Sequence, residues 1–145
     1  MTTRAELSDA EGYTHGHTAL MRAALDGDTE TVRELIHQGV DINQRDDNGR
    51  TALMFAVMNS HYETMKVLLE SGADVQASSK EGGTALMAAA GIAGDLRMVQ
   101  ALLDRGADVH ATLQGTNESA ATFAEKYGRT EIARLLRQVE AGAAG

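Results

Sequence analysis

Apolar residues recur at helical spacing twice within each stretch of about 33 residues. In the clearest stretch, a first helix is predicted after Thr51, with its apolar face on Leu53, Ala56 and Val57. The chain breaks at Asn59-Ser60, and a second helix is predicted from near Tyr62, with Met65, Leu68 and Leu69 facing inward. Helices of about two to three turns are not stable alone, so packing between neighbouring pairs must stabilise them.

The same pattern recurs in register along the chain. The tetrapeptide Thr-Ala-Leu-Met occurs at Thr18–Met21, Thr51–Met54 and Thr84–Met87, and a fixed period of this length is typical of a solenoid. Each Thr is expected to cap the helix that it precedes, through its hydroxyl. Gly39, Gly72 and Gly106 follow the second helices, where a left-handed residue is needed.

The pattern departs from this register in the second half of the chain. One extra residue lies in Gly91–Gly94, and another lies in the loop Ala111–Glu118. In the fourth repeat, Ser119–Thr122 replaces the tetrapeptide. The last predicted helix is polar, as an end cap of a solenoid must be, and Ala141–Gly145 is expected to form a loose tail.

The tetrapeptide, the run Leu68–Val75 and its relative Leu102–Val109 resemble the ankyrin repeat. The resemblance covers roughly residues 13 to 138 and implies an all-α repeat fold, an α-solenoid of about four stacked helix-turn-helix repeats with β-turn fingers and a concave groove. The predicted segments are an N-terminal cap or flexible segment over residues 1–12, repeats over 13–44, 45–77 and 78–111, a degenerate capping repeat over 112–140, and a flexible tail over 141–145.

Some positions differ from the family pattern. Met21, Met54 and Met87 replace the family's His, so a hydrogen bond to the Thr is expected to be lost and the thioethers are expected to pack, buried, between repeats. His61 occupies the family's usual Gly-His position, which implies a structural role.

The amino-acid composition limits which core, which metal sites and which partners this protein can have. The 145 residues are 43% hydrophobic but only 3% aromatic, so the core must be built from Ala, Leu, Val, Ile and Met. The chain has no Cys, which excludes disulfides and thiolate metal sites. Its net charge of −8 and lack of a basic stripe argue against nucleic acid as a partner. Residues 1–16 contain no apolar run, and no segment approaches a membrane span, so a cytoplasmic protein without a membrane partner is expected.

Catalytic and metal-binding motifs are absent from the sequence. It contains no phosphate-binding loop, Gly-x-Ser-x-Gly elbow or nucleophilic Cys, and the carboxylates are spread over predicted outer faces and turns. His15 and His17 lie two residues apart, but two nitrogens alone make a weak metal site. We therefore expect no enzyme activity, no cofactor and no metal.

The resemblance implies that finger tips and the exposed side of the first helices bind a partner. The positions of this sequence that match are His15, His17, Leu25, Asp26, Asp47, Asn48, Arg50, Met58, Asn59, Lys80, Glu81, Gly83, Gly91 and Ile92. Leu25, Met58 and Ile92 would form an apolar strip with a polar rim, typical of a protein-recognition groove, although single exposed apolar residues are also ordinary.

The sequence thus predicts a monomeric, non-catalytic module that binds a partner protein. The alternative is a regulatory inhibitor that masks an enzyme's active site or a basic surface with its acidic face. A metal- or ligand-dependent enzyme and self-association through the groove are further hypotheses.

Overall fold

The computed structural model describes residues 16–142, so the predictions for residues 1–12 and for His15 lie outside the described part of the chain. The chain divides into two compact units, Met1–Asp74 and Val75–Gly145. Each unit holds two helix pairs, and within residues 16–142 no strand is present. The predicted all-α repeat class is confirmed.

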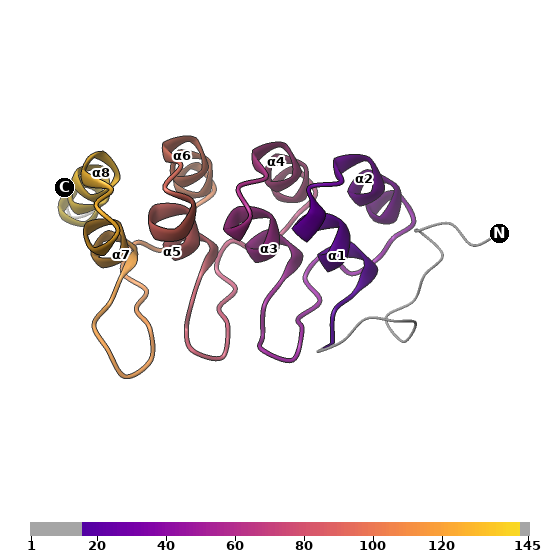
Figure 1. The fold of residues 1–145 in the computed structure, drawn as a ribbon, viewed down its shortest axis with the longest axis horizontal. Helices are drawn as coiled ribbons and strands as arrows, with labels where there is room; N and C mark the ends of the chain where they lie inside the picture. Colours follow the sequence, from indigo (N-terminus) through magenta and orange to yellow (C-terminus); the bar gives the residue numbers. More distant parts are fainter. Residues whose placement is uncertain (1–15, 143–145) are drawn as a thin grey trace. The chain divides into compact units, whose positions relative to one another are not determined.

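The first unit contains α1 (Ala19–Asp26), α2 (Thr29–His37), α3 (Ala52–Met58) and α4 (Tyr62–Glu70). Within it, α1 packs on α3 and α2 packs on α4, so the first helices of the two pairs form one layer and the second helices form another (Figure 1). The core of this unit is built from side chains that are at most 3% exposed: Leu20, Ala24, Val32, Leu35, Val57, Met65 and Leu68.

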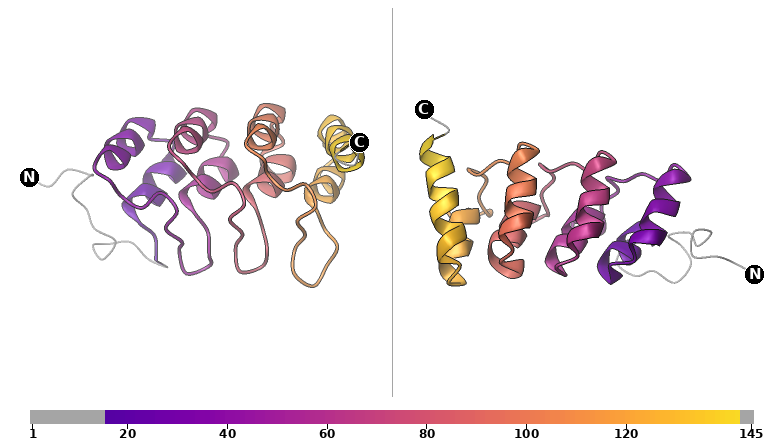
Figure 2. Two further views of the ribbon diagram at one scale, coloured as in Figure 1. Left: turned by 180° about the vertical axis from the view of Figure 1, so that it is seen from behind. Right: turned by 90° about the horizontal axis from the view of Figure 1, so that it is seen from above.

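The second unit contains α5 (Ala85–Ala88), a π-helical turn η2 (Ala89–Ala93), α6 (Leu96–Asp104), α7 (Ala120–Lys126) and α8 (Thr130–Gly142). Here α7 packs on both α5 and η2 (Figure 2). At 13 residues α8 is the longest of these helices, and it includes Ala141 and Gly142, which the sequence assigned to a loose tail. That part of the tail prediction is wrong, because the helix continues where no glycine with left-handed backbone ends it.

The helix ends follow the predicted residues with one exception. Thr18 and Thr84 accept hydrogen bonds from the backbone N–H of Met21 and Met87, at 3.1 and 3.3 Å. Thr51 precedes α3 in the same extended conformation, but its hydroxyl makes no capping bond and is buried without a hydrogen-bond partner. Gly39, Gly72 and Gly106 have φ values of 87°, 99° and 85°, which confirms the predicted left-handed helix ends.

The three repeated methionines are buried as predicted. Met21, Met54 and Met87 are 1%, 4% and 5% exposed. The expected loss of a hydrogen bond is wrong at Met21, whose thioether sulfur accepts from the backbone N–H of Thr18 at 3.4 Å. A sulfur is a weak acceptor, but it completes a capping box at the start of α1.

Side-chain amides join successive loops inside each unit. Asn43 donates from Nδ2 to the carbonyl of Gly72 and accepts from the N–H of Asp74 through Oδ1. In the second unit Gln76 makes the same pair of bonds to Gly106 and Asp108. These bonds fix the loop that leaves one helix pair against the loop that leaves the next.

Candidate functional site

The loop before α3 is organised by one buried carboxylate. The side chain of Asp46 is 0% exposed, and its Oδ1 accepts from the backbone N–H groups of Asn48 and Arg50 at 2.9 and 2.8 Å. Arg50 Nε also donates to Oδ2 at 3.1 Å. Burial alone would raise the pKa of Asp46, but these hydrogen bonds and the charge of Arg50 together hold the pKa below its usual value.

Two predicted partner-binding residues meet at this carboxylate. His17 Nε2 lies 3.4 Å from Asp46 Oδ2, and the His17 ring meets the Phe55 ring edge-on with centroids 5.1 Å apart. The Arg50 guanidinium lies 4.9 Å from the Phe55 centroid. Sequence reasoning missed Asp46 and Phe55. The turn Asp46–Gly49 was the available signal, since Asp readily accepts hydrogen bonds from the N–H groups that follow it.

The tip of that loop and the ends of α1 and α3 carry the remaining predicted residues of this unit. Asp26, Asp47, Asn48 and Asn59 are exposed, whereas Leu25 and Met58 are half-buried. Asn59 Nδ2 donates to the carbonyl of Phe55 at 2.9 Å, which fixes the end of α3. The first unit therefore presents polar groups around two partly exposed apolar side chains.

His61 has the structural role that its position implies. Its Nε2 lies 3.0 Å from the carbonyl oxygen of Leu25, at the end of α1. Gly27 makes room for the ring, because a Cβ on Gly27 would lie 2.4 Å from His61 Nδ1. The φ of Gly27 is 70°, a conformation that also favours glycine.

In the second unit, the extra residue of the third repeat is absorbed by the π-helical turn η2. The backbone N–H of Asp95 donates to the carbonyl of Ala89 at 3.2 Å across the widened end of the helix. Gly91 is buried there, and a Cβ on it would lie 3.0 Å from the Tyr127 ring and 3.1 Å from Phe123 Cβ. Gly91 therefore packs against α7, while its neighbour Ile92 is 52% exposed.

Arg129 holds the end of this turn. Its Nε donates to the carbonyl of Gly91 at 3.2 Å, and its Nη2 donates to the carbonyl of Ile92 at 3.5 Å. Gly94, with φ 59°, makes room for it, since a Cβ there would lie 2.3 Å from Arg129 Nε. The guanidinium binds carbonyls that the end of a helix leaves without partners.

The loop before α5 carries the other predicted residues of the second unit. Lys80 and Glu81 are exposed, and Gly83 is half-buried. Gly83 donates its N–H to Ser79 Oγ at 3.0 Å, and the N–H of Gln114 donates to the carbonyl of Glu81 at 2.8 Å. The Gln114–Glu81 bond ties the tip of this loop to the loop before α7.

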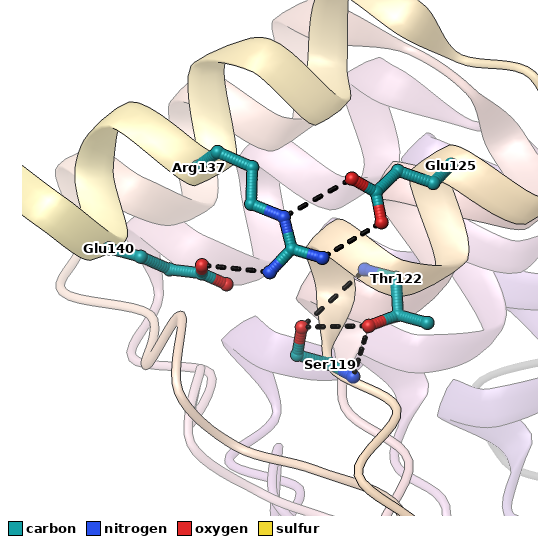
Figure 3. Close-up of polar contacts among 5 residues, drawn as sticks. All are labelled: Ser119, Thr122, Glu125, Arg137 and Glu140. Carbon is teal, nitrogen blue, oxygen red and sulfur yellow. Dashed lines mark hydrogen bonds and ion pairs between the residues drawn. The ribbon is translucent and has the colours of Figure 1, made fainter.

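The last helix pair carries an exposed ionic network (Figure 3). Arg137 binds Glu125 through Nη2 and Nε at 2.8 and 3.2 Å, and it binds Glu140 through Nη1 at 3.0 Å. These bonds raise the pKa of Arg137, and the bonds from Arg137 lower the pKa of Glu125. Below the network, Ser119 caps α7 in a box with Thr122. The sequence predicts this last helix pair as the polar end cap of the repeats.

Each unit carries an open depression, and that of the second unit, of about 780 Å³, lies beside Gln76, Gly82, Thr84 and Gln114. An open depression of about 310 Å³ lies beside Arg33, Ile36, His37, Val67, Glu70 and Ser71. In the described part of the chain, no group of three or more His, Asp or Glu side chains is placed to hold a metal ion. None of the helices described there is both long and apolar enough to cross a membrane.

Comparison with known families gives two matches. A model described as ankyrin repeats, in three copies, matches residues 4–79, and a model of the single ankyrin repeat matches residues 81–112. No curated protein matches the chain.

Proposed function

Because the chain belongs to the ankyrin repeat family, whose repeats are generally protein–protein interaction modules, we propose that it binds a partner protein through the loop tips and the exposed ends of its first helices. Each unit offers such a surface. In the first unit it comprises His17, Leu25, Asp26, Asp47, Asn48, Arg50, Met58 and Asn59. In the second it comprises Lys80, Glu81, Gly83 and Ile92, whereas the buried Gly91 supports the turn. His15 lies outside the described residues, and only its position in the sequence pattern assigns it to the proposed surface.

One observation carries the proposal. Ile92 is 52% exposed on a turn whose neighbouring residue, Gly91, is buried. The π-helical turn therefore presents an aliphatic side chain to solvent. Unusual helical turns of this kind are frequent at functional sites. The half-buried Leu25 and Met58 end the corresponding helices of the first unit.

A double substitution tests this surface. Met58→Glu with Ile92→Glu should abolish capture of partner proteins from a native lysate while leaving the thermal midpoint of unfolding nearly unchanged. The matched control is Val67→Glu with Leu96→Glu, which places the same charges on second helices, α4 and α6, of the same two units. Capture that survives the first pair, or that is lost equally with the second pair, would contradict the proposed surface.

An inhibitor that masks a basic surface is the second candidate. The net charge of −8 and the exposed Asp26, Asp47 and Glu81 favour it. An acidic masking surface should bind strongly at low salt and lose most of its affinity as the salt concentration rises. If the captured proteins stay bound across that range of salt concentration, binding through an acidic surface is ruled out and binding through the apolar side chains remains.

A further inference from the structure

Three side chains of the second unit gather around the buried Gly91. The Tyr127 ring stands where a Cβ on Gly91 would lie 3.0 Å from it, and Ile92 is the next residue along the chain. Arg129 bonds the carbonyl of Gly91 through Nε and that of Ile92 through Nη2. Residues from η2, from the position after α7 and from the loop before α8 therefore meet at Gly91 and Ile92.

Two of these side chains are large, apolar and open to solvent. Ile92 is 52% exposed and Tyr127 is 51% exposed. Among the residues that the structure describes, only Leu96, at 37%, joins them as an exposed large hydrophobic residue. Tyr127 packs on Gly91, the residue before Ile92, so both exposed apolar residues lie on the same part of this unit, as in a surface that binds another molecule.

The third side chain, Arg129, is a cation that pairs with no carboxylate among the described residues. Across residues 16–142, the hydrogen bonds of Arg129 go to carbonyl oxygens, and it forms no ion pair. The neighbouring cations differ, since Lys126 pairs with Glu118 and Arg137 pairs with Glu125 and Glu140. A guanidinium has five N–H donors, so Arg129 keeps donors for an additional acceptor. Because Arg129 is half-buried, an incoming carboxylate would be attracted more strongly than at a fully solvated cation.

We propose that Ile92, Tyr127 and Arg129 form a recognition site for a protein segment in which a carboxylate lies next to an aliphatic or aromatic side chain. The apolar side chain packs on Ile92 and Tyr127, and the carboxylate binds the free donors of Arg129. The inference rests on the proposed protein-binding function, and it adds the chemistry of the bound segment and two residues, Tyr127 and Arg129, to the surface.

Random heptapeptides displayed on phage, selected against the whole chain, provide the probe. The selected peptides should carry Asp or Glu within two positions of Leu, Ile, Phe or Trp. A synthetic peptide of the selected sequence should bind at least about tenfold more weakly to Arg129→Gln and to Ile92→Glu. The matched control is Arg134→Gln, an exposed arginine of α8, which should change the affinity by less than about twofold.

A change in the peptide keeps the test independent of how the variants fold. Replacing the peptide's Glu by Gln, or its Asp by Asn, should weaken binding to the unaltered protein by a similar factor. The inference is overturned if no peptide is selected, if the selected peptides lack carboxylates, or if Arg129→Gln binds as well as the parent. The proposed protein-binding function has a separate test. It is contradicted if the double variant Met58→Glu with Ile92→Glu still captures partner proteins from lysate.

Discussion

Arg129 donates a hydrogen bond from Nε to the carbonyl oxygen of Gly91, 38 residues earlier in the chain, over 3.2 Å. In the other unit, His61 Nε2 lies 3.0 Å from the carbonyl oxygen of Leu25. A glycine with positive φ, Gly94 or Gly27, lets each side chain approach. Two chemically different side chains thus bind the carbonyls at the ends of first helices in two different repeats, and the arginine is always charged.

The contact between Gly94 and Arg129 predicts a large effect of one methyl group. Gly94→Ala should cost the strain of a left-handed alanine, about 1–2 kcal/mol, and about 1 kcal/mol more because Arg129 must move away from its carbonyls. Gly106→Ala is the control, since Gly106 has φ 85° and a Cβ on it would meet nothing within 4 Å. Urea unfolding measures both costs. Equal destabilisation by the two variants would show that Arg129 yields freely.

The two threonines before α1 and α3 should respond oppositely to valine. Thr18→Val removes the acceptor of the Met21 N–H and should destabilise the protein by about 1 kcal/mol. Thr51→Val removes a buried hydroxyl that has no partner, so it should be neutral or slightly stabilising. Unfolding free energies of the two variants provide the measurement. A loss at Thr51 as large as that at Thr18 would indicate a hydrogen bond at the Thr51 hydroxyl.

Asp46 should contribute stability that depends on pH. Its pKa lies below the usual value of 3.8 in the folded chain, so the carboxylate stabilises the fold fully above pH 3.8 and stops doing so as the pH falls through the lowered pKa. Asp46→Asn should cost about 1–3 kcal/mol at neutral pH, because the hydrogen bonds of a buried, charged carboxylate are weakened or lost. The difference from the parent should shrink below about pH 3.8.

The control for that titration is Asp47→Asn, at the exposed neighbouring residue. It should change stability by less than about 0.5 kcal/mol at every pH. Unfolding curves collected from neutral pH down to acid compare the three proteins. A difference between parent and Asp46→Asn that stays constant through acid pH would refute the role of the ionised carboxylate.

The ion pairs of Arg137 should contribute little to the stability of the fold. Arg137→Met removes its bonds to Glu125 and Glu140, but the Arg137 and Glu125 side chains are 47% and 50% exposed, so solvent screens their attraction. The thermal midpoint should fall less than it does for Thr18→Val, and the remaining difference should fade at high salt. A salt-independent loss greater than that of Thr18→Val would show that the network orders the end of α8.

The sequence was sufficient for the helix pairs because their period, apolar faces and terminal glycines are local signals. Gly72 and Gly106 end helices where the pattern predicts, and α4 begins at Tyr62 as predicted. The sequence also shows the one-residue insertion at Gly91–Gly94, but it does not show that the added residue forms a π-helical turn. Whether an added residue lengthens a loop or widens a helix depends on packing, here of Gly91 against Phe123 and Tyr127.

The parts of the candidate site that were missed depend on contacts between distant residues. Asp46 joins His17 across 29 residues, and Arg129 joins Gly91 across 38. The insertions at 91–94 and 111–118 shift the register between Gly91 and Arg129, and the His17–Asp46 contact depends on how two neighbouring repeats pack, which spacing alone does not predict. Thr51 lacks the capping hydrogen bond that Thr18 and Thr84 make, and the motif that the three share does not predict this difference.

The π-helical turn η2 widens the end of one helix without moving the cap of the next helix away from it. Because η2 takes up its added residue within the helix, α6 still begins directly after Gly94 and Asp95, with Asp95 as its cap. Ile92 lies on this turn and is 52% exposed, and the cap of the next helix lies three residues later at Asp95. The side chain at position 92 can therefore be exchanged for another without touching the residues that frame the two helices.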